Sequence, residues 1–159
     1  GLVADHGSDS SCLDHCTRGG RGEYLTEEGN EIVPTGEYFV FMVDDDGYTP
    51  AMLSMAKSQL KKARQWNSMI NRLMIDAGGK RINPAMFWTS YQLTTVPEEN
   101  DQGSWFGWSV KILHDAASGG IIANHPQGKD IYLAARDFKA QLSTGEVRVS
   151  PEAQDDDVM

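Results

Sequence analysis

Three segments in the middle of the chain have a regular spacing of hydrophobic and polar residues, and they predict a hairpin, a helix and a second hairpin. Residues 37–43 are mostly β-branched or aromatic, as in a strand. The Asp-Asp-Gly sequence that ends at Gly47 predicts a tight turn, because glycine accepts positive φ angles. The returning segment contains Pro50, which favours an edge or bulged strand. A helix that starts here, with Thr49 as its N-cap, is the alternative.

Residues 57–75 follow a helical period, and the glycine pair Gly78 and Gly79 is expected to end this helix. Its apolar face consists of Ala56, Leu60, Ala63, Trp66, Ile70, Leu73 and Met74. Its opposite face consists of Lys57, Lys61, Arg64, Ser68 and Arg72. A charged face is usually only solvated, but a solvated helix normally mixes Glu with Lys. No acidic residue lies between Tyr48 and Ile75, which favours a surface that binds anions.

Residues 86–96 and 104–113 alternate as two strands, and the intervening PEENDQG is expected to be their loop. The expected core face of this hairpin consists of Phe87, Tyr91, Leu93, Phe106, Trp108, Val110 and Ile112. Trp88 and Trp105 then share the polar face with Lys111. Two explanations are open for aromatic residues on a polar face. They could stack on nucleic-acid bases, at about 1–3 kcal/mol per base, or pack beneath the N-terminal segment or the last helix.

The order hairpin, helix, hairpin predicts an α+β, β-rich fold with an OB-like, partly open barrel. Residues 1–145 form one expected domain, in which 1–36 are an irregular lead-in and 130–142 form a C-terminal helix. Residues 146–159 are expected to be a disordered acidic tail. The chain starts without Met, which indicates a processed terminus or a missing upstream part.

Charge is distributed unevenly along the 159 residues, whose net charge is −9. Residues 51–90 contain seven Lys and Arg residues against Asp76 alone, a net charge of +6, so the rest of the chain carries −15. A local basic surface determines phosphate binding more than the overall charge does. No apolar run approaches the roughly 18 residues that a transmembrane helix needs.

Candidate metal ligands occur in two places, and neither forms a convincing site. The first set, His6, Cys12, His15 and Cys16, has ligand types suited to zinc, but adjacent His15 and Cys16 rarely both face one ion. Two free thiols in a loop are the simpler interpretation. The three acids Asp44, Asp45 and Asp46 could suggest magnesium but are more simply a hairpin tip. The segment GGKR at residues 78–81 lacks the spacing of a phosphate-binding loop, and we expect neither enzymatic activity nor a cofactor.

The helix, the sequence FWTSYQLTTVPEENDQGSWFGW and the C-terminal DDDVM together resemble a tailed-phage family of single-stranded DNA-binding, helix-destabilising proteins. The resemblance covers residues 1–145 and is strongest over 52–66 and 89–108. It implies a sequence-nonspecific single-stranded DNA-binding protein that supports replication or recombination in the cytoplasm of an infected bacterium. The resemblance rests on the overall sequence pattern rather than on a catalytic motif.

On this hypothesis, phosphates would be bound by Lys57, Lys61, Arg64, Arg72, Lys80, Arg81 and Lys111. Bases would stack on Trp88 and Trp105, with Tyr48 as a weaker candidate. The tail residues Asp155, Asp156, Asp157, Val158 and Met159 would compete with DNA and bind replication or recombination proteins. A homo-oligomer is compatible with the sequence.

Two other hypotheses remain open at this point. One is a protein-interaction or assembly module that works through its acidic surface and binds no nucleic acid. The other is a metal-dependent enzyme that uses the acids of residues 44–46 or the Cys/His cluster. No membrane association is expected for any of them.

Overall fold

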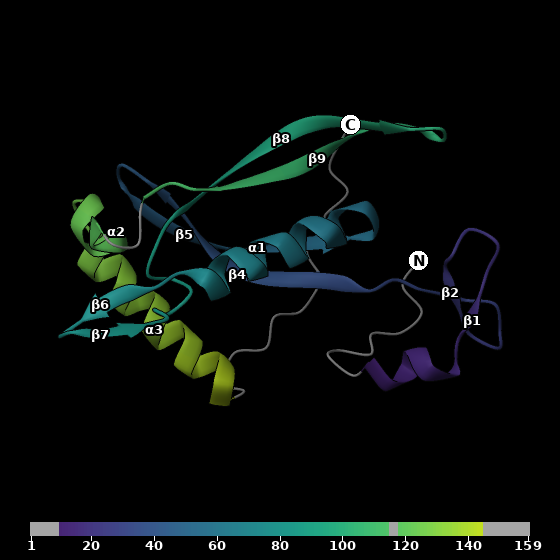
Figure 1. Cartoon of the computed structure of the whole chain (residues 1–159), viewed down its shortest axis with the longest axis horizontal. Helices are drawn as coiled ribbons and strands as arrows, with labels where there is room; N and C mark the ends of the chain where they lie inside the picture. The colour runs from purple at the N-terminus through teal and green to yellow at the C-terminus, as the bar shows by residue number, and fades with distance from the viewer. Residues whose placement is uncertain (1–9, 115–117, 145–159) are drawn as a thin grey trace, which may run out of the picture.

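Two long hairpins and the helix between them form the centre of the fold (Figure 1). The computed structural model describes residues 10–114 and 118–144. The first hairpin pairs β4 (Thr35–Asp44) with β5 (Gly47–Ala56), and α1 (Leu60–Arg72) follows it. The second hairpin pairs β8 (Tyr91–Asn100) with β9 (Gly103–Ile112).

Smaller elements flank this centre on both sides in sequence. The N-terminal part forms a three-stranded antiparallel sheet, although we expected an irregular lead-in. The remaining elements are η1 (Ser10–His15), β1 (Thr17–Arg18), β2 (Tyr24–Leu25), β3 (Glu31–Ile32), η2 (Lys57–Gln59), β6 (Ile75–Ala77), β7 (Lys80–Ile82), α2 (Gly120–Asn124) and α3 (Gly128–Thr144).

No helix among the described residues is long and apolar enough to cross a membrane.

The first hairpin has the turn that its sequence predicts. One carboxylate oxygen of Asp44 accepts the backbone N–H groups of Asp46, at 3.0 Å, and of Gly47, at 2.9 Å. Gly47 has a φ of 152°, which favours glycine at this turn. Pro50 lies within β5, opposite Phe41, so the alternative helix that starts at this proline is wrong.

Leu60, Ala63, Trp66 and Ile70 of the predicted apolar face pack into the core with both hairpins. The other three predicted members lie outside α1, because Ala56 ends β5 and Leu73 and Met74 follow the helix. Trp66 is buried and stacks on Tyr38 of β4, with ring centroids 4.5 Å apart. Its edge also contacts Tyr91 of β8, at 5.4 Å between centroids. The buried part of this cluster is Tyr38, Met55, Ala63, Trp66 and Ile70, with Leu93, Trp108 and Val110 of the second hairpin packed against it.

The end of α1 differs from the prediction. The helix stops at Arg72 and the chain turns to an extended conformation at Leu73, six residues before the second glycine of the expected pair. The amide of Asn83 donates hydrogen bonds to the carbonyl oxygens of Ile70, at 3.0 Å, and Leu73, at 2.8 Å. The Ile70 carbonyl oxygen also accepts the backbone N–H of Leu73, at 3.1 Å, so a side chain distant in sequence adds to the hydrogen bonds at the end of the helix. Gly78 instead belongs to the turn of the β6–β7 hairpin.

The first strand of the second hairpin begins and ends later in the sequence than predicted, at Tyr91–Asn100 rather than at residues 86–96. Its strands continue through the expected loop to a tight turn between Asn100 and Gly103. Phe87 and Trp88 precede β8 and are not in a strand, so their predicted places on its faces are wrong. Phe106, expected in the core, is 75% exposed.

The α+β, β-rich class is confirmed, whereas the OB-like barrel is not. In the described parts of the chain, each hairpin is a separate two-stranded sheet and no barrel closes. The core explains this, because α1 contributes its apolar residues to both long hairpins and so links them through side chains rather than backbone hydrogen bonds.

Helix α3 covers the other face of the first hairpin. Phe138 contacts the rings of Phe39 and Phe41, at 6.0 and 5.8 Å between centroids. The loop before α3 also holds the hairpin tip, because Gln127 donates to the carbonyl oxygen of Asp46. The predicted helix over residues 130–142 is confirmed and extends two residues further at each end.

Candidate nucleic-acid interface

The exposed face of α1 forms one side of an open groove of about 630 Å³. Met69 and Leu73 supply its apolar part from the helix, and Ile112 at the end of β9 joins them from the second hairpin. The full lining is Lys61, Arg64, Gln65, Ser68, Met69, Arg72, Leu73 and Ile112. The basic helix face of the sequence analysis is therefore one side of a groove with an apolar floor.

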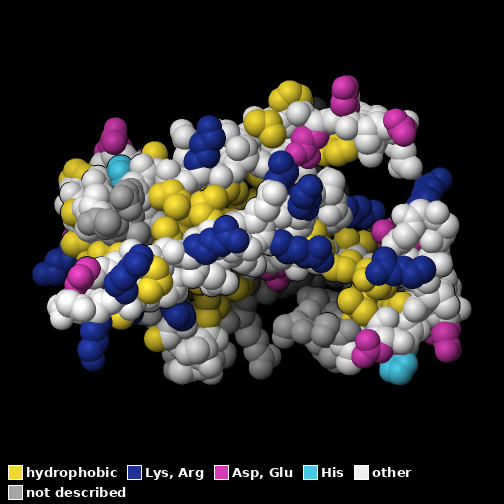
Figure 2. All heavy atoms as spheres, viewed as in Figure 1, with side chains coloured by type: hydrophobic (Ala, Val, Ile, Leu, Met, Phe, Trp, Pro, Cys, Tyr) yellow, Lys and Arg dark blue, Asp and Glu magenta, His cyan; other side chains and the backbone are white. Residues whose placement is uncertain are grey.

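Three cations line this groove, and all are exposed and form no ion pair with the described residues. They are Lys61, Arg64 and Arg72, which lie along one side of the helix. Lys61 and Arg72 are eleven positions apart, which is roughly 16 Å along a helix axis at 1.5 Å per residue. Figure 2 shows Lys and Arg side chains gathered over α1 and the β6–β7 hairpin on one face of the molecule.

The β6–β7 hairpin extends this basic surface beyond the end of α1. Lys80 and Arg81 on β7 are exposed and likewise have no ion pair in the part of the chain that the structure describes. Asn83 ties the end of this hairpin to the last turn of α1. The backbone N–H of Gly79 donates to the Asp76 carboxylate at 2.8 Å, so the residues 78–81 form a structured turn rather than a simple connection to the next strand.

Two of the predicted phosphate ligands, Lys57 and Lys111, neither line the groove nor lie on the β6–β7 hairpin. The ammonium of Lys57 lies 3.4 Å from the Glu31 carboxylate, and Lys111 is exposed on β9 but does not line the groove. Lys62, on α1, pairs with Glu98 at 2.9 Å. The groove therefore brings together a subset of the basic residues that sequence reasoning selected.

A comparison with protein families identifies relatives of the chain. The family model described as Pam3 phage gp34-like protein matches residues 1–148. The chain belongs to the Pam3 phage gp34-like family. No curated protein and no solved structure matches the chain. The match confirms the phage part of the resemblance that the sequence suggested.

Within this phage protein, the two tryptophans expected to stack bases lie apart from the groove. The ring of Trp88 meets Tyr132 of α3 edge-on, at 5.8 Å between centroids, and its carbonyl oxygen accepts the N–H of Ile121 at 2.8 Å. Of the two explanations given for Trp88, packing beneath the last helix is the one that the structure supports. Tyr48 stacks on Phe41, at 4.5 Å, on the first hairpin.

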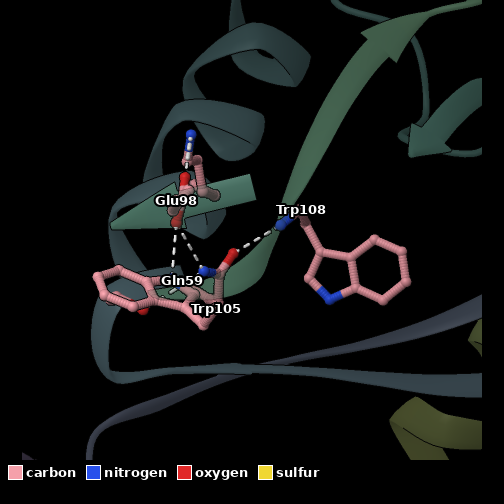
Figure 3. A network of polar contacts seen from close by, with 6 residues as sticks. Gln59, Glu98, Trp105 and Trp108 are labelled. Atoms are coloured by element: carbon pink, nitrogen blue, oxygen red, sulfur yellow. Dashed lines mark hydrogen bonds and ion pairs between the residues drawn. The ribbon is translucent and has the colours of Figure 1, made fainter. Parts of the chain in front are cut away.

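Trp105 belongs to a polar cluster where the second hairpin crosses the start of α1 (Figure 3). Its indole N–H donates to the Glu98 carboxylate at 2.9 Å, and the Gln59 amide donates to the same oxygen at 3.2 Å. The Gln59 side-chain oxygen accepts the backbone N–H of Trp108 at 2.8 Å. The cluster fastens β9 to the helix, so Trp105 has a structural role here.

The hydrogen bond and ion pair with Lys62 hold the pKa of Glu98 below its ordinary value of 4.5, and the Trp105 and Gln59 donors act in the same direction. A carboxylate with a lowered pKa stabilises the fold above that ordinary value, and the contribution is lost as the pH falls through the lowered pKa.

We expect the Glu98→Gln variant to lose part of the acid sensitivity of the wild type. Its unfolding free energy should fall less than that of the wild type when the pH drops from 7 to below 4.5. Urea unfolding followed by tryptophan fluorescence measures this. Glu99→Gln is the matched control, because Glu99 is exposed and has no ion pair among the described residues. Equal pH dependence of both variants would contradict this role for Glu98.

Of the two remaining sets of predicted residues, the Cys/His set is described in part and the tail set lies outside the described residues. Cys12, His15 and Cys16 lie on or next to η1, and the Cys16 thiol donates to the Cys12 carbonyl oxygen at 3.2 Å. Among the residues described, no three His, Cys, Asp or Glu side chains are grouped as metal ligands. His6 and the tail residues 155–159 lie outside the described residues.

Proposed function

We propose that this phage protein binds single-stranded DNA in the groove beside α1, with little sequence preference. The observation that supports this most is the combination of unpaired cations and an apolar floor. Lys61, Arg64 and Arg72 line the groove, and Lys80 and Arg81 continue the basic surface. All five are exposed, and none forms an ion pair with the described residues.

The charge of the groove is opposite to that of the whole chain, which is −9. Exposed cations without partners repel one another, so their concentration on one helix face costs stability unless an anion binds there. Phosphate groups of a nucleic-acid backbone are suitable anions, and their counterions are released on binding.

The apolar floor favours a single strand over a duplex. A duplex presents phosphates and groove edges to a protein surface, whereas a single strand can also place base and sugar faces against apolar side chains. Met69, Leu73 and Ile112 offer such a surface between the cations. These residues replace Trp88 and Trp105 as the proposed base contacts, and the site on α1 needs no OB-like barrel.

Replication or recombination in the infected bacterial cell is the proposed context of this activity. The acidic tail, residues 155–159, is the proposed contact for partner proteins and a competitor for the groove. An assembly role is the second candidate function, because Phe106 is 75% exposed at the far end of the second hairpin.

A fluorescence-anisotropy titration with labelled oligonucleotides tests the proposal. We expect a mixed-sequence single strand to bind at low salt, and a duplex of the same sequence to bind more weakly. Single strands of different sequence should bind alike. No binding of the single strand at low salt, or a preference for the duplex, would contradict the proposed function.

A further inference from the structure

The far end of the second hairpin projects an apolar side chain into solvent. Phe106 on β9 is 75% exposed, the largest exposure among the large hydrophobic side chains in the described chain. Its cross-strand neighbour, Pro97, is also exposed. An aromatic side chain with this exposure wastes apolar area unless a partner covers it.

The same end of the hairpin is acidic. Glu99 and Asp101 are exposed next to the turn and form no ion pair with other described residues. Figure 2 shows acidic side chains at this end of the molecule, away from the basic band over α1. We define the hairpin tip as residues 97–106, an acidic surface with one prominent aromatic side chain.

Addition of a partner strand to this part of β8 is disfavoured. Pro97 has no backbone N–H, and proline at a free sheet edge interrupts the hydrogen bonds that an added strand would need. The Gln59 side chain already accepts the N–H of Trp108 from β9. The tip is therefore suited to docking through side chains.

The groove beside α1 has complementary properties. Its cations, including Lys61, Arg64 and Arg72, would face the acids of the tip, and its apolar floor would accept an aromatic ring. Its volume of about 630 Å³ exceeds what one phenylalanine side chain requires. The hairpin tip and the groove are thus complementary, with acids opposite cations and an aromatic ring opposite an apolar floor.

The tip of a chain cannot enter the groove of the same chain. Phe106 lies in the half of β9 next to the turn, and Ile112, which lines the groove, is the last residue of this strand, six residues and roughly 20 Å away. We propose that the hairpin tip of one copy docks into the α1 groove of a second copy, with Phe106 against the apolar floor. Self-association and single-stranded DNA then compete for the same groove, and this competition rests on the proposed function.

Sedimentation equilibrium of the wild type and of Phe106→Ser tests the docking. The wild type should associate reversibly, and Phe106→Ser should raise the dissociation constant for self-association by roughly tenfold or more, as for loss of a central aromatic anchor. Met42→Ser is the matched control, because Met42 is 58% exposed on the other hairpin. A wild type that stays monomeric, or equal effects of both substitutions, would overturn the proposal.

A mixing experiment identifies the two surfaces. Phe106→Ser keeps an intact groove, and the double variant Lys61→Glu/Arg64→Glu keeps an intact tip. Each variant alone should self-associate more weakly than the wild type, because every contact between its copies lacks one of the two surfaces. Their mixture should form a complex through one intact interface, whereas the absence of any complex would contradict docking of tip into groove. Phe106→Ser should bind an oligonucleotide at least as tightly as the wild type does, because no hairpin tip competes for its groove. Loss of self-association with retained DNA binding therefore separates this inference from the proposed function.

Discussion

Replacing Trp66 with alanine is expected to lower the free energy of unfolding by about 3–5 kcal/mol, the usual cost of removing a large buried aromatic side chain. Trp66 is only 5% exposed and lies between Tyr38 and Tyr91. It thus joins α1 to both long hairpins, and alanine would leave a cavity where the three elements meet. Urea unfolding at neutral pH, followed by circular dichroism, measures this loss.

Trp66→Phe is the matched control for this prediction. The indole N–H of Trp66 is buried and has no hydrogen-bond partner among the described residues, so phenylalanine removes area without breaking a hydrogen bond. Its cost should be clearly smaller than that of alanine. Equal stability of Trp66→Ala and the wild type would show that the core is not organised around this side chain.

Reversing two charges in the groove is expected to weaken single-stranded DNA binding by about a hundredfold at low salt. In the double variant Lys61→Glu/Arg64→Glu, the charge at each of the two residues changes from +1 to −1, next to the groove in which the phosphates are proposed to bind. One pair of unit charges 4 Å apart is worth about 1 kcal/mol in water, so the change approaches 4 kcal/mol before salt screening reduces it. Both residues are exposed and the fold should be retained. Anisotropy titration with a labelled oligonucleotide gives the dissociation constants.

Lys129→Glu/Lys139→Glu is the control with the same change in net charge. Both lysines are exposed on α3, which packs against the face of the first hairpin away from the core that α1 forms. This control should weaken binding by no more than about threefold, because neither lysine lines the groove and salt screens charges over a Debye length of about 10 Å. Equal losses in the two double variants would mean that overall charge, rather than the groove, determines binding.

The parts of the fold that follow from local sequence are predictable. The turn at Gly47 depends on a φ of 152° and on the adjacent Asp44 carboxylate, and both are encoded within a few residues. The buried and exposed faces of α1 follow from its period, as Trp66 and Arg64 illustrate.

The parts that depend on distant residues are not predictable in this way. The last turn of α1 receives two hydrogen bonds from Asn83, eleven residues beyond Arg72, and no local sequence pattern predicts them. Strand alternation places Phe106 beside Trp108 on one face, yet Phe106 lies at the far end of a hairpin that extends past the core. Alternation predicts the face of a residue but not whether another element covers that face.

The candidate site likewise has one part that the local sequence predicts and one part that depends on tertiary packing. The basic side of the groove, with Lys61, Arg64 and Arg72, is visible in the sequence because it lies on one helix. Its apolar floor includes Ile112, which reaches the groove only through the packing of β9 beside α1. A groove between two elements is a tertiary feature, and periodicity within each element gives no information on it.

The salt dependence of oligonucleotide binding tests the central claim most directly. If Lys61, Arg64, Arg72, Lys80 and Arg81 each neutralise one phosphate of a single strand, the logarithm of the association constant should fall against the logarithm of the salt concentration with a slope of about −3.5. A slope near this value would support a single strand that follows the basic surface from α1 to β7. A slope near zero would contradict phosphate contacts there and, with them, the proposed function.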